Sequence, residues 1–507
     1  MSCQLNLSER AVPDEVNTSH LFAQVLFIFY LCIRRKNYSR TDKTNDKNMK
    51  HLFLLLSLAL TVMTANGQSY RSVIAQNPRK SASNYSVYPS PKGPLAPSPA
   101  GYRPFYMSHY GRHGSRFLID PRQYSRPVAI LAHADSLGML TAEGRSALAS
   151  ARAMAAEALN RYGELTHLGA LQHRQIAYRM EHRFPEIFAD TTATIQARST
   201  VVIRCILSME NELQELLRYN SRLKIDCDAS EHDMYYMNNY KDTMVQRLRK
   251  SPEVRKAYSD WVSAHVDNRP LMHRLFNNAT YADTISSADV LAADLFHLAT
   301  IAQNSEIGDK IDLYNLFTTD ELYHLWQQTN VWWYLNYGAS AVSGGRMPWA
   351  QRFLVRNIVD EADSCLRLSH PNATMRFGHE SVVLPLVCLL DIDGYGVQTA
   401  DLDSLEALKW INTNIYPMGC NVQFVFYKPT DGKSDKPVLV KVLLNEEEAT
   451  LPIRPYTLPR KPRSRAAADN GGTVAGVYYS WPDVRQYLLS RAMPGCSEAC
   501  CRGSKNG

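Results

Sequence analysis

The sequence has no internal repeat and no long low-complexity tract in its 507 residues, and it has no strong excess of charge of either sign. Its 56 Lys+Arg exceed its 49 Asp+Glu by seven, and three of these positive charges lie in residues 1–67. A nucleic-acid-binding protein needs a larger basic excess, so we predict no nucleic-acid partner. With 45% hydrophobic residues the chain can build a substantial core, and functional charge must act locally.

Apolar runs long enough to span a bilayer are also missing. The run LFLLLSLALTVM after Met49 has 12 residues, whereas a membrane span needs about 20. Because small residues follow it up to Gly67, we interpret residues 1–67 as an N-terminal segment whose signal peptide starts at Met49 and is cleaved near Gly67. A second apolar stretch, Leu21 to Ile33, could be an anchor; we interpret residues 1–48 as an over-extended start instead. The mature chain is then exported, periplasmic or secreted, without a stable membrane span.

Metal-binding clusters of cysteine are absent as well. Eight of the ten cysteines follow the N-terminal segment. Disulfides can form in an exported protein, but which cysteines would pair cannot be read from a single sequence. The cluster CSEACC near the end has no second ligand cluster at zinc spacing and no histidine close by. We therefore predict no metal there, and either a disulfide or a flexible tail over residues 495–507.

The chain divides by its patterns into an α/β core interrupted by a helical cap. The predicted segments are an extended lead-in over 68–100, a first core part over 101–215, the cap over 216–358 and a second core part over 359–494. In the core, a strand pattern is followed by a helix pattern twice, which is typical of an α/β layer. The fold class we predict is a three-layer α/β core, with a central mixed sheet and flanking helices, plus a mainly helical cap.

Particular patterns place the elements of this core. Pro104 to Met107 is typical of a buried strand. A helix pattern with a Thr N-cap follows at Thr141 and ends at Gly163, and another helix pattern follows Thr166 and stops at Pro185. VVLPLVCLLDI predicts a buried helix, and NVQFVFYKP with KPVLVKVLL predicts a hairpin across DGKSD. Five of the seven tryptophans lie in the cap, where we expect them chiefly to pack its core.

Two charged turns each stand between a strand pattern and a helix pattern. The first holds Arg112, His113 and Arg116, and the second holds His379 and Glu380. Helix N-termini at strand ends bind anions, so we expect an anion pocket between the turns. Arginines would clamp a phosphoryl group, a histidine can attack phosphorus, and a carboxyl group can protonate the leaving alcohol.

Each turn also has an ordinary structural explanation. Arg-His-Gly by itself fits a solvated basic turn, and His379-Glu380 by itself fits a helix cap with a surface carboxylate. Together with an arginine in a third helical segment, Arg204, they indicate a site instead.

At these residues the chain resembles the histidine acid phosphatases, the branch of the histidine phosphatase superfamily that includes phytases and multiple inositol polyphosphate phosphatases. The similar segments are RHGSR at 112–116, LTAEG at 140–144, LTHLGALQH at 165–173, ARSTVVIR at 197–204, FGHES at 377–381 and the terminal NVQFVFY with VLVKVLLNE. The resemblance implies an α/β core with a helical cap, hydrolysis of small phosphomonoesters and no cofactor or metal.

The resemblance also implies a role for each site residue. His113 resembles the phosphorylated nucleophile, and Glu380 resembles the proton donor. Arg112, Arg116, Arg204 and His379 match the family's phosphate-binding residues. The chain departs from the family in having Leu118 where many members have proline, and His-Glu where they have His-Asp or His-Ala-Glu. The second departure makes Glu380 the assignment that most needs a test.

Substrate choice is left open by the sequence. Inositol polyphosphates are one class, and a Pro-containing run with five cations, Arg454, Arg460, Lys461, Arg463 and Arg465, could attract a polyanion or be a solvated loop. Lys and Arg in the cap are equal candidates. Two other functions also stay open: a phosphate-binding or polyanion-binding protein with a weakened pocket, and a phosphotransferase of the same superfamily. The pH optimum, disulfides and oligomeric state cannot be read from the sequence.

Overall fold

The computed structural model describes residues 69–238, 241–431, 435–458 and 476–493, and this part of the chain is built on one mixed sheet. The strands are β1 (Tyr102–Arg112), β2 (Thr194–Ser199), β3 (Lys224–Asp228), β4 (Asn372–Gly378), β5 (Asn421–Pro429), β6 (Leu439–Leu444), β7 (Glu447–Ala449) and β8 (Tyr479–Ser480). Their order is β3-β2-β4-β1-β5-β6-β7, and β8 pairs with β6.

One half of the sheet is parallel and the other is antiparallel. Strands β3, β2, β4 and β1 run in parallel, while β5, β6, β7 and β8 are joined by antiparallel pairing, and β5 is antiparallel to β1. The registers pair Arg112 with Gly378, and Ser199 with Phe377. The carboxyl ends of β1, β4 and β2 therefore lie side by side at one edge, where ligands bind in open α/β sheets.

The strands form where the sequence is apolar on both faces of the sheet. In β1 only Arg103 is exposed, and β4 and β6 are buried throughout, which is typical of central strands covered on both sides. The predicted strand at residues 104–107 and the predicted hairpin are confirmed, the latter by the antiparallel pair β5 and β6.

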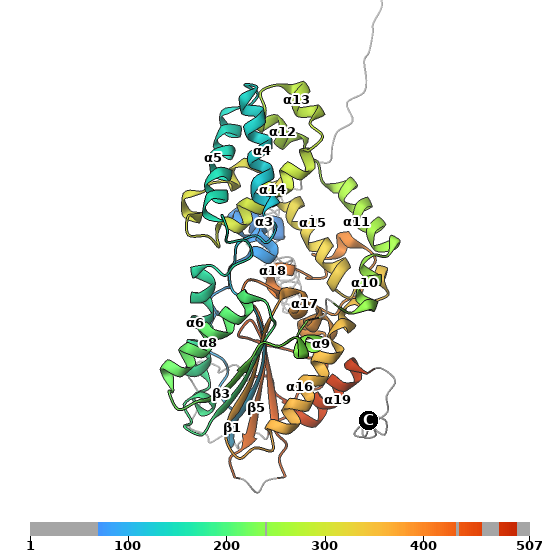
Figure 1. Ribbon diagram of the computed structural model, residues 1–507. Coiled ribbons are helices and arrows are strands. Elements are labelled where there is room, and N and C mark those ends of the chain that lie inside the picture. Colours follow the sequence, from blue (N-terminus) through green and yellow to red (C-terminus); the bar gives the residue numbers. More distant parts are fainter. Residues whose placement is uncertain (1–68, 239–240, 432–434, 459–475, 494–507) are drawn as a thin grey trace, which may run out of the picture. The chain divides into compact units, whose positions relative to one another are not determined.

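Helices cover both faces of this sheet (Figure 1). One layer contains α6 (His167–Arg183), α7 (Pro185–Phe188) and α8 (Ile203–Tyr219), and the other contains α16 (Arg352–Cys365), α17 (Glu380–Leu389) and α19 (Trp481–Ala492). As predicted, α6 begins after Thr166, whose hydroxyl accepts from the Gly169 N–H, and VVLPLVCLLDI lies largely in α17. The predicted three-layer α/β core is confirmed.

A second hydrophobic core lies in the helical part. It is built from α3 (Tyr70–Gln76), α4 (Arg122–Ser136), α5 (Ala142–Glu157), α12 (Arg269–Leu275), α14 (Ala288–Ala302) and α15 (Thr319–Tyr337). The upper part of Figure 1 shows α4 and α5 beside α12, α13 (Ala279–Thr284) and α14. Of the five tryptophans predicted to pack the core of the cap, Trp326 is buried in this second core, whereas Trp261 and Trp333 are buried in the cluster that includes the sheet.

The remaining helical elements are short, apart from α11, and connect these layers. They are α9 (Met234–Met237), α10 (Thr243–Arg249), α11 (Pro252–His265) and α18 (Asn412–Ile415), with the 3₁₀ helices η1 (Pro78–Tyr85), η2 (Glu231–Asp233), η3 (Gly308–Lys310), η4 (Tyr314–Leu316), η5 (Ala341–Ser343), η6 (Met347–Gln351), η7 (Ile392–Gly394) and η8 (Leu402–Ser404). In the described part of the chain, no helix combines the length and apolarity that crossing a membrane requires.

Three details differ from the sequence-based expectation. Strand β3 falls within residues 216–358 yet pairs with β2, and α4 and α5 of the predicted first core part pack on α12 and α14. Both α4 and α5 bury apolar residues in the second core, together with α12 and α14. Helix α5 also ends at Glu157 rather than Gly163, because Asn160 adopts a left-handed φ of 63° and turns the chain earlier.

The predicted extended lead-in is wrong at its start, where α3 and η1 form. Ser69 caps α3 by accepting from the Ser72 N–H, and Tyr70 and Ile74, one turn apart, are buried in the second core. The sequence pattern missed this helix because its stability comes from tertiary packing. The predicted signal peptide, the tail after residue 494 and most of the cationic run at 454–465 lie outside the described residues.

Candidate active site

The structure brings the six predicted site residues together at the carboxyl ends of β1, β2 and β4. Arg112 is the last residue of β1, and His113 and Arg116 lie in the turn that follows. His379 is the N-cap of α17, and Glu380 is its first residue. Arg204 lies in the first turn of α8, which follows β2. Arg204 is half-buried, and the other five are buried.

The imidazole of His113 has one ring nitrogen fixed and the other free. Its Nδ1 lies 2.9 Å from the carbonyl oxygen of Gly114, and because a carbonyl only accepts, Nδ1 must donate. Its Nε2 therefore has a lone pair in the neutral ring, and it lies 3.6 Å from a carboxylate oxygen of Glu380. The ring of His379 stands roughly at right angles to it, with the ring centroids 5.7 Å apart.

Both histidines are held neutral. Burial, with the nearby Arg204 guanidinium, lowers the pKa of His113 well below its usual range. The same two causes lower the pKa of His379 to about 4. The main chain reinforces the position of the first ring, since the His113 N–H donates to the carbonyl of Gly378 at 2.9 Å. A neutral imidazole with a free Nε2 is the form that can act as a nucleophile.

Glu380 is ionised in the free site. Its Oε2 lies 3.0 Å from Nε of Arg112. Burial by itself would raise the pKa of this carboxyl, but the charges of Arg112 and Arg116 outweigh burial and lower the pKa of Glu380 to about 2. The side chain therefore enters the reaction as a carboxylate unless a bound group offsets the arginine charges.

Each of the three arginines is anchored through one Nη. Arg112 donates to the carbonyl of Tyr416 at 2.8 Å, Arg116 to its neighbour Phe117 at 2.8 Å, and Arg204 to Gly163 at 3.3 Å. Other donors of the same groups are buried and have no hydrogen-bond partner among the described residues, namely Arg112 Nη2, Arg116 Nε and Arg204 Nε. Unpaired buried donors are costly, so the site is built for an anion that accepts from them.

Two helix N-termini add to this positive field. Arg204 lies in the first turn of α8, and Glu380 begins α17, so the free N–H groups and the positive dipole ends of both helices lie at the site. The ligand atoms of His113, His379 and Glu380 lie within 4.8 Å of one another and could in principle hold a metal ion. The surrounding guanidinium groups oppose a cation there, so we assign no step to a metal.

Several supporting residues were not predicted. Ser208 Oγ accepts from the Gly114 N–H at 3.1 Å, and Thr200 Oγ1 lies 3.3 Å from Nε2 of His379. Asn304 binds the Ser115 hydroxyl at 2.6 Å. Ser208 lies one turn after Arg204 in α8, so helical spacing could have indicated it. Asn304 is far away in sequence, and no local signal points to it.

The glycine at the centre of the turn is required by a close backbone approach. A Cβ on Gly114 would lie 2.4 Å from the carbonyl oxygen of Gly169, at the start of α6. No flexible side chain can move aside there, because the neighbour is backbone.

Gly114→Ala is therefore expected to separate the turn from α6 and to cost about 1–3 kcal/mol of unfolding free energy. We also expect a loss of activity of about 10²-fold, because the nucleophile shifts. Urea unfolding and p-nitrophenyl phosphate hydrolysis measure the two effects. The matched control is Gly93→Ala, since no atom lies within 4 Å of a Cβ at Gly93. Equal behaviour of the two variants would contradict this account of the turn.

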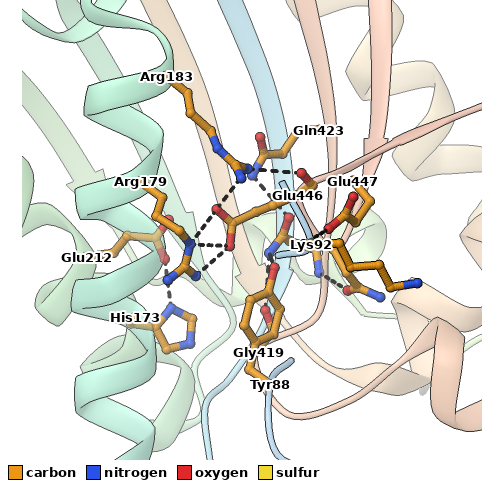
Figure 2. Close-up of polar contacts among 12 residues, drawn as sticks. Tyr88, Lys92, His173, Arg179, Arg183, Glu212, Gly419, Gln423, Glu446 and Glu447 are labelled. Carbon is orange, nitrogen blue, oxygen red and sulfur yellow. Dashed lines mark hydrogen bonds and ion pairs between the residues drawn. The ribbon is translucent and has the colours of Figure 1, made fainter. Parts of the chain in front are cut away.

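A polar cluster ties α6 to the turn after β6, at the same end of the sheet as Arg112 (Figure 2). The Glu446 carboxylate, in the turn between β6 and β7, accepts from Arg179 at 2.6 Å and lies 3.5 Å from Nη1 of Arg183. Also on α6, His173 is paired with the buried Glu212 of α8 at 2.7 Å. These contacts hold α6, and with it the helix start that meets Gly114, in a fixed position.

His109, on β1 and four residues before the nucleophile candidate, makes the fold sensitive to acid. Its ring is buried against Phe377, its Nδ1 has no hydrogen-bond partner among the described residues, and burial lowers the pKa of His109 to about 3. In the unfolded chain a histidine gains a proton below its ordinary pKa of 6.5, whereas the folded form stays neutral until about pH 3. Folding stability is therefore lost as the pH falls through this window.

His109→Phe is expected to reduce this acid sensitivity. At about pH 4.5 the wild-type histidine costs roughly 2–3 kcal/mol relative to pH 7, at about 1.4 kcal/mol for each pKa unit. Unfolding free energies of both proteins measured from pH 7 to 4.5 give the difference directly. A stability gap between variant and wild type that does not change with pH would contradict the prediction.

Comparison with family models identifies the family of this chain. The model of the histidine phosphatase superfamily (branch 2) matches residues 112–445, a range that contains all six site residues. None of the curated proteins matches the chain.

Solved structures share the fold. The multiple inositol polyphosphate phosphatase of Bifidobacterium longum, in complex with inositol hexasulfate, superimposes with a TM-score of 0.58 at 17% identity, covering 81% of this chain and 97% of that one. The phytase from D. castellii has a TM-score of 0.53 at 12% identity, covering 82% of this chain and 86% of that one. At such low identity the likeness shows the fold, and the catalytic argument must come from the residues.

Proposed function

We propose that this chain, which belongs to branch 2 of the histidine phosphatase superfamily and is a histidine-type phosphatase, is an exported phosphomonoester hydrolase that works through a phosphohistidine. The observation that carries the proposal is that three arginines at the His113 site have buried guanidinium donors without a hydrogen-bond partner among the described residues. A phosphoryl group supplies the acceptors that these donors lack.

In the first half-reaction, Nε2 of His113 attacks phosphorus. The nitrogen lone pair forms the N–P bond, the P–O bond to the substrate alcohol breaks, and the alcohol oxygen leaves with a proton from Glu380. Arg112, Arg116 and Arg204 stabilise the charge on the equatorial oxygens of the phosphoryl group, and His379 contacts it from the start of α17.

In the second half-reaction, the carboxylate of Glu380 takes a proton from water. The water oxygen attacks phosphorus, the N–P bond breaks, and inorganic phosphate leaves with the neutral imidazole restored. The bond from Nδ1 to the Gly114 carbonyl keeps the ring in one orientation through both steps.

Proton delivery from Glu380 requires the pKa of this carboxyl to rise on substrate binding, since it is about 2 in the free site. A bound phosphate brings negative charge next to Arg112 and Arg116 and so offsets the cause of the low pKa. A substrate monoanion also carries a proton into the site, because the second phosphate pKa is about 6. The substrate can thus supply the proton that Glu380 transfers.

Inositol polyphosphates are the substrate class that we propose. The structure from Bifidobacterium longum with inositol hexasulfate has the same fold, and its name gives its activity as a multiple inositol polyphosphate phosphatase. The test is release of phosphate by protein starting at Gln68, assayed on p-nitrophenyl phosphate, phytate and 2,3-bisphosphoglycerate. Release from none of the three would overturn the proposal.

Export rests on the signal-like segment after Met49, which the structure does not describe. The N-terminus of the protein purified from the producing cells tests it. We expect an N-terminus close to Gln68, and a protein that keeps residues 1–48 would contradict both the start at Met49 and the cleavage.

A further inference from the structure

The cations of the cap fall into two groups once their partners are known. One group is paired with neighbouring carboxylates, as in Lys256–Asp260, Arg269–Asp267, Arg274–Glu321 and Arg352–Asp242. Arg249, the last residue of α10, is different. It is half-buried, and it has no carboxylate partner among the described residues.

The Arg249 guanidinium lies over an aromatic ring. Its central carbon lies 3.8 Å from the ring centroid of Tyr337, and its Nε donates to the carbonyl of Asn336 at 3.0 Å. Neither Nη donates a hydrogen bond to a described residue. A stacked arginine with one anchored nitrogen presents its remaining N–H groups in a fixed plane, which is the geometry that binds phosphate oxygens in pairs.

Tyr337 connects Arg249 to the catalytic residues. Its ring packs on Trp333 with centroids 4.6 Å apart, and Trp333 packs on Tyr416 at 4.9 Å. The carbonyl of Tyr416 in turn accepts from Arg112. Helices α10 and α17 both contact α15, the helix that carries Tyr337 and Trp333. No hydrogen bond of the Tyr337 hydroxyl to another described residue is found.

We propose that Arg249 and Tyr337 form a second phosphate subsite, which binds a phosphate of the substrate other than the one that His113 attacks. The proposal rests on the proposed function, and it adds a preference for substrates with several phosphates. Arg249 donates to the second phosphate, and the Tyr337 hydroxyl donates to the same group or to its ester oxygen. The aromatic series Tyr337, Trp333 and Tyr416 fixes the subsite relative to Arg112.

Burial explains why this arginine, rather than another cap cation, is suited to the task. Arg247, on the same helix, is exposed, and its Nε donates to the main chain of its own helix. Its charge is screened by water, whereas Arg249 is held in a partly desolvated place where a charged hydrogen bond is stronger. A phosphate at Arg249 also gives this cation the ion pair that no described carboxylate forms with it.

The test compares Arg249→Gln with Arg247→Gln, which removes the same charge from the same helix. We expect Arg249→Gln to lower kcat/KM for phytate about 10-fold or more and to leave kcat/KM for p-nitrophenyl phosphate within about 2-fold, since that substrate has one phosphate. Arg247→Gln should change neither value by more than about 2-fold. Tyr337→Phe keeps the stacked ring and should give a smaller loss that is again confined to phytate.

A binding measurement separates this inference from the proposed chemistry. Calorimetric titration with inositol hexakissulfate, which is not a phosphate ester, should show a dissociation constant about 10-fold weaker for Arg249→Gln than for wild type, with unchanged affinity for inorganic phosphate. If the protein hydrolyses no phosphomonoester but this difference in binding is found, the proposed function fails and the subsite stands. Three results would overturn the subsite. They are an equal loss of kcat/KM on phytate and p-nitrophenyl phosphate in Arg249→Gln, equal effects of Arg249→Gln and Arg247→Gln, and unchanged binding of inositol hexakissulfate by Arg249→Gln.

Discussion

Replacing His113 by Ala is expected to abolish phosphate release from both p-nitrophenyl phosphate and phytate, with a fall in kcat of about 10⁴-fold or more. Losses of this size follow removal of a nucleophile that acts as a unit with its neighbours. The arginine clamp stays in place in the variant, because Arg112, Arg116 and Arg204 are anchored to main-chain carbonyls rather than to His113. The variant should therefore still bind inorganic phosphate while it no longer turns over.

Trapping the intermediate makes this prediction specific. Wild-type protein mixed with a ³²P-labelled phosphomonoester and quenched in alkali should retain label on the peptide that contains residues 112–116, and His113→Ala should retain none. The matched control is His182→Ala, which removes an exposed histidine of α6 and should leave both labelling and turnover unchanged. Undiminished turnover by His113→Ala, or label on another histidine, would refute the assignment of the nucleophile.

The sequence predicted which residues meet at the carboxyl ends of β1, β2 and β4, because the signals for them are local. A buried strand pattern ends in RHGSR, and a second ends in FGHES; parallel pairing of β1 with β4 then places Arg112 opposite Gly378. Strand direction and burial therefore determine the distance between His113 and His379 once the sheet is known. Arg204 follows the same rule, because β2 is the next strand and α8 follows it.

The parts that the sequence could not predict depend on contacts between distant segments. Helix α3 forms because Tyr70 and Ile74 are covered by the second core, and nothing in its neighbourhood in the sequence indicates that cover. The support of Ser115 by Asn304 likewise joins the first turn to a cap loop. Arg249 could not be distinguished from the other cap cations by its spacing, since its stacking on Tyr337 exists only in the folded chain.

Glu380→Gln is expected to slow the enzyme by an amount that depends on the leaving group. Glutamine keeps the length and the polarity of the side chain but has no acidic proton, so it cannot protonate a departing alcohol. For phytate, whose leaving alkoxide is a strong base, we expect kcat to fall by about 10²–10⁴-fold, the usual range for general acid catalysis. For p-nitrophenyl phosphate the loss should be much smaller in the first step, because nitrophenolate leaves as a stable anion.

The two half-reactions can be separated with the same variant. With p-nitrophenyl phosphate, Glu380→Gln should release a burst of nitrophenolate and then slow down, because the carboxylate that activates water is missing while phosphohistidine still forms. Glu380→Asp is the matched control: it retains the acid on a side chain one methylene shorter, and it should recover most of the activity on phytate.

Equal loss on both substrates without a burst would instead assign Glu380 a purely electrostatic role beside Arg112, from which its Oε2 is 3.0 Å away. The pH dependence distinguishes the two roles independently. If the substrate monoanion brings the proton, kcat/KM of wild type should fall as the pH rises past about 6, the second pKa of a phosphate monoester. In Glu380→Gln this fall should be weaker, because the proton no longer has a group that passes it to the leaving oxygen.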